Sequence, residues 1–154
     1  MRRAKILLLL PVLFLVFSQS SEAQLRSRKT VVSNPPPISS EIKSTPAFAE
    51  ILLRKSILEA EQADLLVRYT KEFPKVQEIS YELSVLEKAL TRISKVPAAE
   101  TQKLTLALGK MLIQEAAYAT ELELLVKKYN KDHPEVKRTA KKLEIFSLAV
   151  DEIL

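Results

Sequence analysis

Few residues of this sequence belong to the types that carry out catalysis or bind metal ions. The chain has 154 residues, no cysteine and a single histidine, His133. The lack of cysteine excludes disulfides, thiolate nucleophiles and cysteine-based metal sites. A catalytic or metal-binding histidine needs positioned partners, and one chain offers no second histidine. We therefore interpret His133 as structural and expect no metal ion and no cofactor; a metal bridging two copies is the alternative.

The acidic residues also lack the arrangement of a catalytic site. Most are glutamates at positions that a helix would turn toward solvent, such as Glu61 and Glu121. The sequence has no phosphate-binding loop, no nucleophile elbow and no metalloprotease motif. We therefore expect no catalytic residue and predict that the protein is not an enzyme.

Basic residues gather in one stretch, residues 127–142, where seven basic side chains stand against two acidic ones. The basic residues are Lys127, Lys128, Lys131, Lys137, Arg138, Lys141 and Lys142. Such a cluster could attract an anionic glycan, lipid headgroups or an acidic protein. The alternative is an ordinary solvated helix surface.

A short motif occurs twice, sixty residues apart, and contains this basic stretch in its second copy. The first copy reads Tyr69-Thr-Lys-Glu-Phe-Pro-Lys-Val76, and the second reads Tyr129-Asn-Lys-Asp-His-Pro-Glu-Val136. Proline disfavours helical geometry in the residue before it, so each copy is expected to end one helix and begin another. We predict two corners whose structural residues are Tyr69, Pro74, Val76, Tyr129, His133, Pro134 and Val136.

Hydrophobic periodicity predicts helices on both sides of each corner, at about 46–71, 75–94, 97–131 and 134–154. Thr45 and Pro46 have the residue types of an N-cap and a first helical residue. The only glycine, Gly109, is expected to be a weak point in the third helix. The first helix has an apolar face of Phe48, Ile51, Leu52, Leu58, Leu65, Leu66 and Tyr69.

The second and fourth helices carry narrower stripes with alternating spacings of three and four residues. The second stripe is Val76, Ile79, Leu83, Leu86, Leu90 and Ile93, and the fourth is Val136, Thr139, Leu143, Phe146, Val150 and Ile153. Identical pairs such as Leu52 and Leu112 extend the repeat beyond the corner. We predict an all-α fold with two tandem αα-hairpins, 46–94 and 97–154, arranged as a four-helix bundle or as elongated coiled-coil-like hairpins.

The corner resembles the turn of the periplasmic coiled-coil hairpins in bacterial polysaccharide chain-length determinant and exopolysaccharide export proteins. The second copy, from Tyr129 through His133 and Pro134 to Val136, is the closer match, because the first has Phe73 in place of histidine. The resemblance covers about thirty residues per copy, and it implies a coiled-coil hairpin and a link to polysaccharide export. The chain lacks the two flanking membrane helices and the folded base domain of that family.

The first 23 residues have the pattern of a secretory signal peptide, with Arg2, Arg3 and Lys5 before an apolar run, 6–17. That run would extend only about 18 Å as a helix, which is short for a hydrocarbon core of about 30 Å. We expect cleavage after Ala23, with an uncleaved anchor as the alternative. A flexible proline-containing linker, 24–45, should follow.

The expected protein is therefore exported, periplasmic or secreted, with no transmembrane helix in the mature chain and no nucleic-acid partner. We predict a helical scaffold or interaction protein that binds a protein partner or a second copy through the stripes of the second and fourth helices. The alternative is a periplasmic holdase-like chaperone or a protein that binds an anionic envelope polymer.

Overall fold

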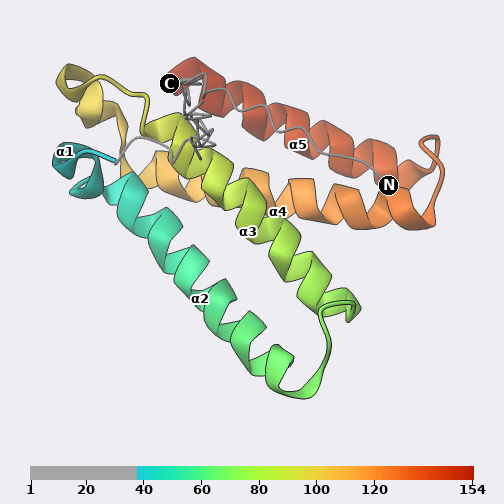
Figure 1. Cartoon of the computed structure of the whole chain (residues 1–154). Helices are drawn as coiled ribbons and strands as arrows, with labels where there is room; N and C mark the ends of the chain where they lie inside the picture. The colour runs from blue at the N-terminus through green and yellow to red at the C-terminus, as the bar shows by residue number, and fades with distance from the viewer. Residues whose placement is uncertain (1–37) are drawn as a thin grey trace, which may run out of the picture. The chain divides into compact units, whose positions relative to one another are not determined.

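The computed structural model describes residues 38–154, all of which belong to one compact unit, 36–154. The leader and most of the predicted linker lie outside the described residues. Within residues 38–154 every regular element is helical, so the all-α prediction is confirmed (Figure 1). The elements are α1 (Ser40–Lys43), α2 (Pro46–Arg68), α3 (Pro74–Ile93), η1 (Ala98–Lys103), α4 (Leu106–Lys128) and α5 (Pro134–Ile153).

Three of the long helices begin at proline, as predicted. Pro46, Pro74 and Pro134 are the first residues of α2, α3 and α5. Proline suits this position because its fixed backbone angle is helical and the first amide of a helix has no intrahelical acceptor. Thr45 caps α2, since its Oγ1 atom accepts a hydrogen bond from the Phe48 amide at 3.4 Å.

The predicted single helix over 97–131 is wrong. A six-residue 3-10 helix, η1, comes first, and α4 starts only at Leu106. Thr105 caps α4 by accepting a hydrogen bond from the Leu108 amide at 3.2 Å, as Thr45 does for α2. Leu104, between η1 and α4, leaves helical geometry with φ −78° and ψ 58°, and its side chain is buried in the core. The break therefore precedes Gly109, which lies in the first turn of α4.

The predicted linker is too long at its C-terminal end. Residues 40–43 form the short helix α1, capped by Ser39, whose Oγ atom accepts a hydrogen bond from the Ile42 amide at 3.4 Å. The side chain of Ile42 is buried in the same cluster as the core residues of the long helices. Because one apolar side chain anchors it, this segment belongs to the folded unit.

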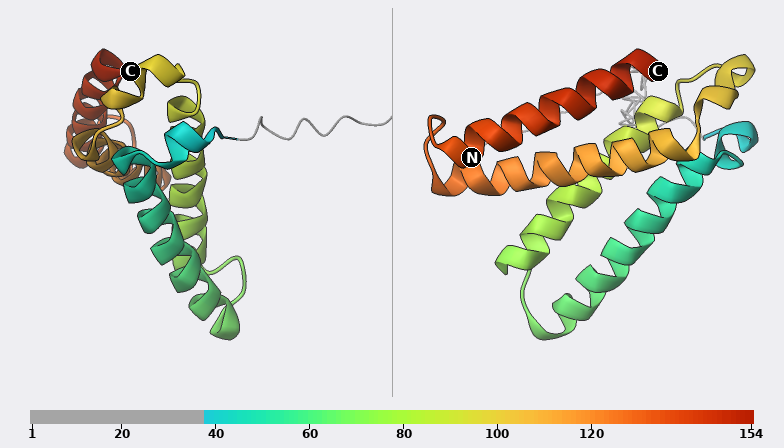
Figure 2. Two further views of the ribbon diagram at one scale, coloured as in Figure 1. Left: turned by 90° about the vertical axis from the view of Figure 1, so that its left-hand side faces the viewer. Right: turned by 180° about the vertical axis from the view of Figure 1, so that it is seen from behind.

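The four long helices form two antiparallel hairpins, α2–α3 and α4–α5, which diverge so that their corners lie apart on the same side of the unit (Figures 1 and 2). Both α2 and α3 pack against α4, whereas α5 packs mainly against α4 alone. Within residues 38–154, α4 is thus the helix that joins the hairpins. This arrangement differs from a closed four-helix bundle, in which α5 would also pack along α2.

The hairpins are in closest contact near the N-termini of α2 and α4. The Ala47 amide, one of the donors left free at a helix start, donates to the Leu104 carbonyl at 3.2 Å. A Cβ atom added to Gly109 would lie 2.9 Å from the Cα atom of Ala47. Gly109 therefore allows two helix backbones to approach each other.

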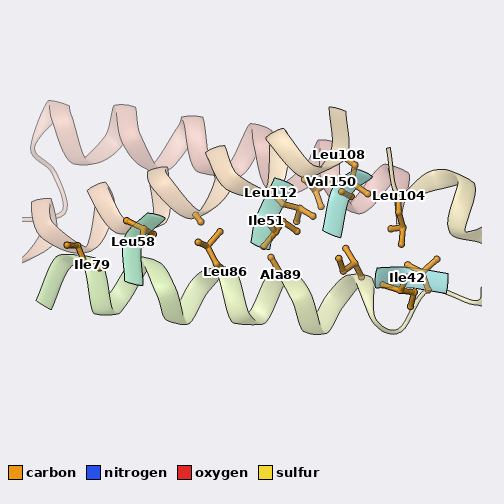
Figure 3. Close-up of a cluster of buried hydrophobic side chains, with 14 residues drawn as sticks. Ile42, Ile51, Leu58, Ile79, Leu86, Ala89, Leu104, Leu108, Leu112 and Val150 are labelled. Carbon is orange, nitrogen blue, oxygen red and sulfur yellow. The ribbon is translucent and has the colours of Figure 1, made fainter. Parts of the chain in front are cut away.

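A single hydrophobic core draws residues from every long helix (Figure 3). Its largest buried side chains are Ile51 and Leu58 from α2, Ile79, Leu86 and Ile93 from α3, Leu104 from the segment before α4, Leu108 and Leu112 from α4, and Val150 from α5. Complete burial of each such side chain is worth about 1.5–3 kcal/mol. The core is shared, so neither hairpin has a separate one.

The predicted stripes of α3 and α5 are confirmed as packing surfaces. In α3, Val76, Ile79, Leu86 and Ile93 are buried, and in α5 Val136, Thr139 and Val150 are buried. The remaining stripe residues are half-buried. These surfaces pack within the chain itself.

Candidate functional site

The two corners have the same backbone structure. Tyr69 ends α2 with φ −129° and ψ 161°, and Tyr129 ends α4 with φ −130° and ψ 156°. Each tyrosine amide donates to the carbonyl four residues earlier, of Leu65 or Leu125, at 2.8 Å. The bounds of α4 and α5 are those of α2 and α3 moved by sixty residues. The sequence repeat is therefore accompanied by a repeat of local structure.

The aromatic side chains of each corner are stacked. The ring centroids of Tyr69 and Phe73 are 4.1 Å apart, and those of Tyr129 and His133 are also 4.1 Å apart. His133 adds a hydrogen bond that Phe73 cannot make, because its Nδ1 atom accepts from the Glu135 amide at 3.2 Å. This geometry gives His133 a helix-capping role. No cluster of three potential metal ligands occurs within residues 38–154.

The predicted basic cluster surrounds the second corner, and most of its members have a partner. Four cations pair with carboxylates: Lys127 with Glu123, Lys137 with Asp132, Arg138 with Glu135, and Lys141 with Glu144, at 2.9–3.2 Å. Lys142 lies 5.3 Å from the ring centroid of Tyr118, within range of a cation–π contact. Lys128 and Lys131 are exposed and form no ion pair with another described residue.

The first corner has the same fold but a different charge. Residues 67–82 carry three basic and three acidic side chains, giving zero, whereas residues 127–142 carry seven and two, giving +5. Lys75 donates to Glu78 at 2.8 Å, and this hydrogen bond raises the pKa of Lys75. Hydrogen bonding from the Thr70 side chain holds the pKa of the Glu72 carboxyl below its ordinary value. The positive charge is thus specific to the second corner.

Two shallow hollows lie between α3 and α4, with volumes of about 180 and 190 Å³. The first is lined by Tyr81, Thr120 and Leu124 among others, and the second by Val85, Ala89 and Leu112. Both are smaller than the roughly 300–1,000 Å³ typical of small-molecule sites. They show where α3 and α4 face each other.

An exposed apolar surface lies on the outer side of α2, and sequence reasoning missed it. Leu52 and Leu66, predicted to share the buried face, are exposed. Together with Leu53, Ile57 and Val67 they leave much of the length of α2 apolar on its outside, and the small residues Ala49, Ala60 and Ala63 are also exposed there. We call this surface, residues 49–67 on the outside of α2, the outer face of α2.

A second exposed apolar surface lies on α5. Ile145 and Leu148 are 54% and 61% exposed, and Ala149 is half-buried beside them. We call these three residues the outer face of α5. Single exposed apolar residues are ordinary, whereas groups of them on one helix make that face a candidate for contact with a partner.

Residues 38–154 contain no helix long and apolar enough to cross a membrane. In comparisons with known proteins, no family model, no curated protein and no solved structure matches the chain.

Proposed function

We propose that this chain is a scaffold or interaction protein of the cell envelope that acts by packing helices against a partner. It would be exported, with its leader removed. The observation that carries the proposal is the outer face of α2, where large aliphatic side chains of a helix built into the core remain in contact with solvent.

The surface has the properties of a helix-binding site. At about 1.5 Å per residue, the 23 residues of α2 extend roughly 35 Å, enough for several turns of a partner helix. Small residues such as Ala60 and Ala63 alternate with large ones such as Leu53 and Val67 along it. That mixture lets a second helix approach closely and bury aliphatic side chains.

A photo-crosslinking residue at position 53 of the full chain, in the native cell, tests this proposal. We expect a discrete crosslinked product with a protein, and we expect Leu52→Lys in the same chain to remove it. The matched control carries the crosslinker at Glu87, an exposed position on α3. The proposal is wrong if position 53 yields no more product than position 87.

A second candidate function, binding of an anionic polymer, is favoured by the charge difference between the corners. The two corners share backbone and stacking geometry, yet only the second has an excess of five positive charges. The resemblance of this corner to hairpins of polysaccharide export proteins favours an acidic polysaccharide as the ligand. Exposed lysines such as Lys128 and Lys131 would supply the first contacts.

Binding to dextran sulfate, used as a model acidic polysaccharide, tests this second function. We expect affinity to fall steeply as salt rises, and the double variant Lys128→Glu, Lys131→Glu to bind at least about tenfold more weakly. The double variant Arg68→Glu, Lys71→Glu, which makes the corresponding two changes at the first corner, is the matched control. Binding that is insensitive to salt, or equal losses in both variants, would exclude the second corner as the site.

A further inference from the structure

Because the sequence repeats after sixty residues, α4 is the equivalent of α2 and α5 is the equivalent of α3. The neighbours of each helix can therefore be compared with those of its equivalent. In this chain α3 packs antiparallel on α4: Arg92 pairs with Glu115 at 3.0 Å, and Val85 and Ala89 lie beside Leu112. Farther along, Tyr81 faces Thr120 and Leu124 across the first hollow. We call this contact the α3–α4 junction.

The outer face of α2 occupies the same position on its helix as the α4 side of that junction. Leu112 of α4 corresponds to Leu52 of α2, and Thr120 corresponds to Ala60. Leu112 is 1% exposed and Leu52 is 45% exposed, although both are leucine. The difference arises because α3 covers α4 at this position, whereas no segment within residues 38–154 covers α2 in the same way.

The outer face of α5 corresponds to the α3 side of the same junction. Ile145 stands at the position of Val85, Ala149 at that of Ala89, and Leu148 at that of Lys88. Val85 and Ala89 of α3 thus have apolar counterparts on α5, whereas Tyr81 and Arg92 have charged ones. The two large apolar residues of α5, Ile145 and Leu148, are exposed. The outer face of α2 is therefore equivalent to the α4 side of the junction, and the outer face of α5 is equivalent to its α3 side. Within residues 38–154 these two faces do not pack against each other.

We propose that the partner for the outer face of α2 is a second copy of this chain, whose α5 packs antiparallel on it and repeats the α3–α4 junction. This inference rests on the proposed function. In the repeated junction Ile145 and Ala149 of one copy lie against Leu52 of the next. The contact is heterologous, because each copy uses a different surface on its two sides, and it extends into a linear assembly unless rotation closes a ring.

Charge complementarity favours this arrangement. The Arg92–Glu115 pair of the existing junction corresponds to Glu152 on α5 and Lys55 on α2, a pair with its signs reversed. At the other end, Tyr81 and Leu124 correspond to Lys141 and Asp64, which also have opposite charges. Lys55, Asp64 and Lys141 already have ion-pair partners within the chain, so each would share its charge between that partner and the second copy. A symmetric contact between two α2 helices would leave the outer face of α5 unused.

The close approach of helix backbones at Gly109 lies outside the α3–α4 junction. Gly109 of α4 admits the backbone of α2, and its counterpart on α2 is Ala49. That approach is between α4 and α2, not between α4 and α3, so the contact between copies does not require it. We expect a dissociation constant in the micromolar range, as is common for small interfaces of this kind.

Sedimentation velocity of the full chain expressed from Met1 tests the proposal with two variants, one for each face. Leu52→Lys, Ile57→Lys changes the outer face of α2, and Ile145→Lys, Leu148→Lys changes that of α5. All four residues are exposed, so folding should be retained, which circular dichroism would verify. We expect the unmodified chain to associate with rising concentration and each variant to associate at least about tenfold more weakly.

Mixing the two variants gives the decisive result. Each retains the face that the other has lost, so an equimolar mixture should form dimers and nothing larger. Val126→Lys, which introduces one lysine at an exposed residue of α4, should associate like the unmodified chain. The proposal is overturned if the unmodified chain stays monomeric to about millimolar concentration, if the α5 variant associates normally, or if the mixture stays monomeric.

A charge exchange tests the direction of the helices. Lys55→Glu and Glu152→Lys should each weaken association by roughly two- to fivefold, and the two together in one chain should restore it. Additive losses in the double variant would rule out the antiparallel register.

The crosslinker at position 53 separates this inference from the proposed function. A product with α5 of a second copy supports both. A product with a different protein supports the function and overturns the inference, as does a product with residues before 38 of the same chain. Absence of any product overturns both.

Discussion

At the scale of single residues, the two corners show how one substitution changes a role without changing a structure. Phe73 and His133 occupy equivalent positions, and each stacks on the tyrosine four residues earlier at the same centroid distance, 4.1 Å. Only His133 also satisfies a free amide at the start of the next helix. His133, the only histidine of the sequence, therefore acts here as a helix cap.

Exchanging these two residues should transfer the cap between corners. His133→Phe keeps the stack but leaves the Glu135 amide without its acceptor, so we expect a loss of about 1 kcal/mol in the free energy of unfolding. Phe73→His should gain a similar or smaller amount. Urea unfolding at pH 8 measures both changes. Equal stability of all three proteins would show that the hydrogen bond of His133 contributes nothing to the fold.

At the scale of helices, the N-terminal ends determine how the hairpins meet. Thr45 and Thr105 cap α2 and α4 in the same way, and the Ala47 amide bonds to the carbonyl of Leu104. Gly109 lies one turn farther along and lets the backbones approach. In isolation a glycine inside a helix is a weakness, but here its missing side chain makes room for the neighbouring helix.

Gly109→Ala should therefore destabilise the protein, contrary to helix propensity. Alanine in place of glycine normally stabilises a helix by about 0.5–1 kcal/mol. Here the new methyl group would meet the backbone of α2, and overpacking of this kind costs about 1–3 kcal/mol. The control is Ala49→Gly at the equivalent exposed position, which should cost only its helix propensity. Thermal unfolding that shows Gly109→Ala to be more stable would disprove the close contact.

At the scale of the whole folded unit, both hairpins depend on one core. Leu112 of α4 lies in a cluster with Ile51 of α2, Leu86 of α3 and Val150 of α5 (Figure 3). Arg92 adds ion pairs from α3 to Glu115 on α4 and to Asp151 on α5, at 3.0 and 2.6 Å. The unit should therefore unfold in one cooperative transition.

Leu112→Ala tests this cooperativity. Removing a fully buried leucine should cost about 2–5 kcal/mol, and hydrogen exchange should accelerate in α3 and α5 alike. Leu52→Ala, at the exposed counterpart, should cost less than about 1 kcal/mol in monomeric protein. Faster exchange confined to α4 and α5 would mean that the hairpins are stable independently.

Much of the fold follows from local sequence. Proline at positions 46, 74 and 134 marks the helix starts, and the three-four spacing of Val76 through Ile93 identifies the packing face of α3. These signals act through neighbouring residues, so they can be recognised without knowledge of the rest of the molecule. The break before Leu106 was missed, although Thr105 repeats Thr45 after sixty residues and offered a signal for it.

The candidate interaction surface depended on tertiary structure alone. Leu52 and Leu112 are the same residue at the same place in a repeated helix, and no local pattern separates them. One is buried and the other exposed because α4 has α3 on that side, whereas no described helix of this chain takes the equivalent place on α2. The sequence by itself determined where helices begin and which stripes they carry. Which apolar face is left for a partner depends on how many neighbours each helix has, and only the packing of the two hairpins decides that.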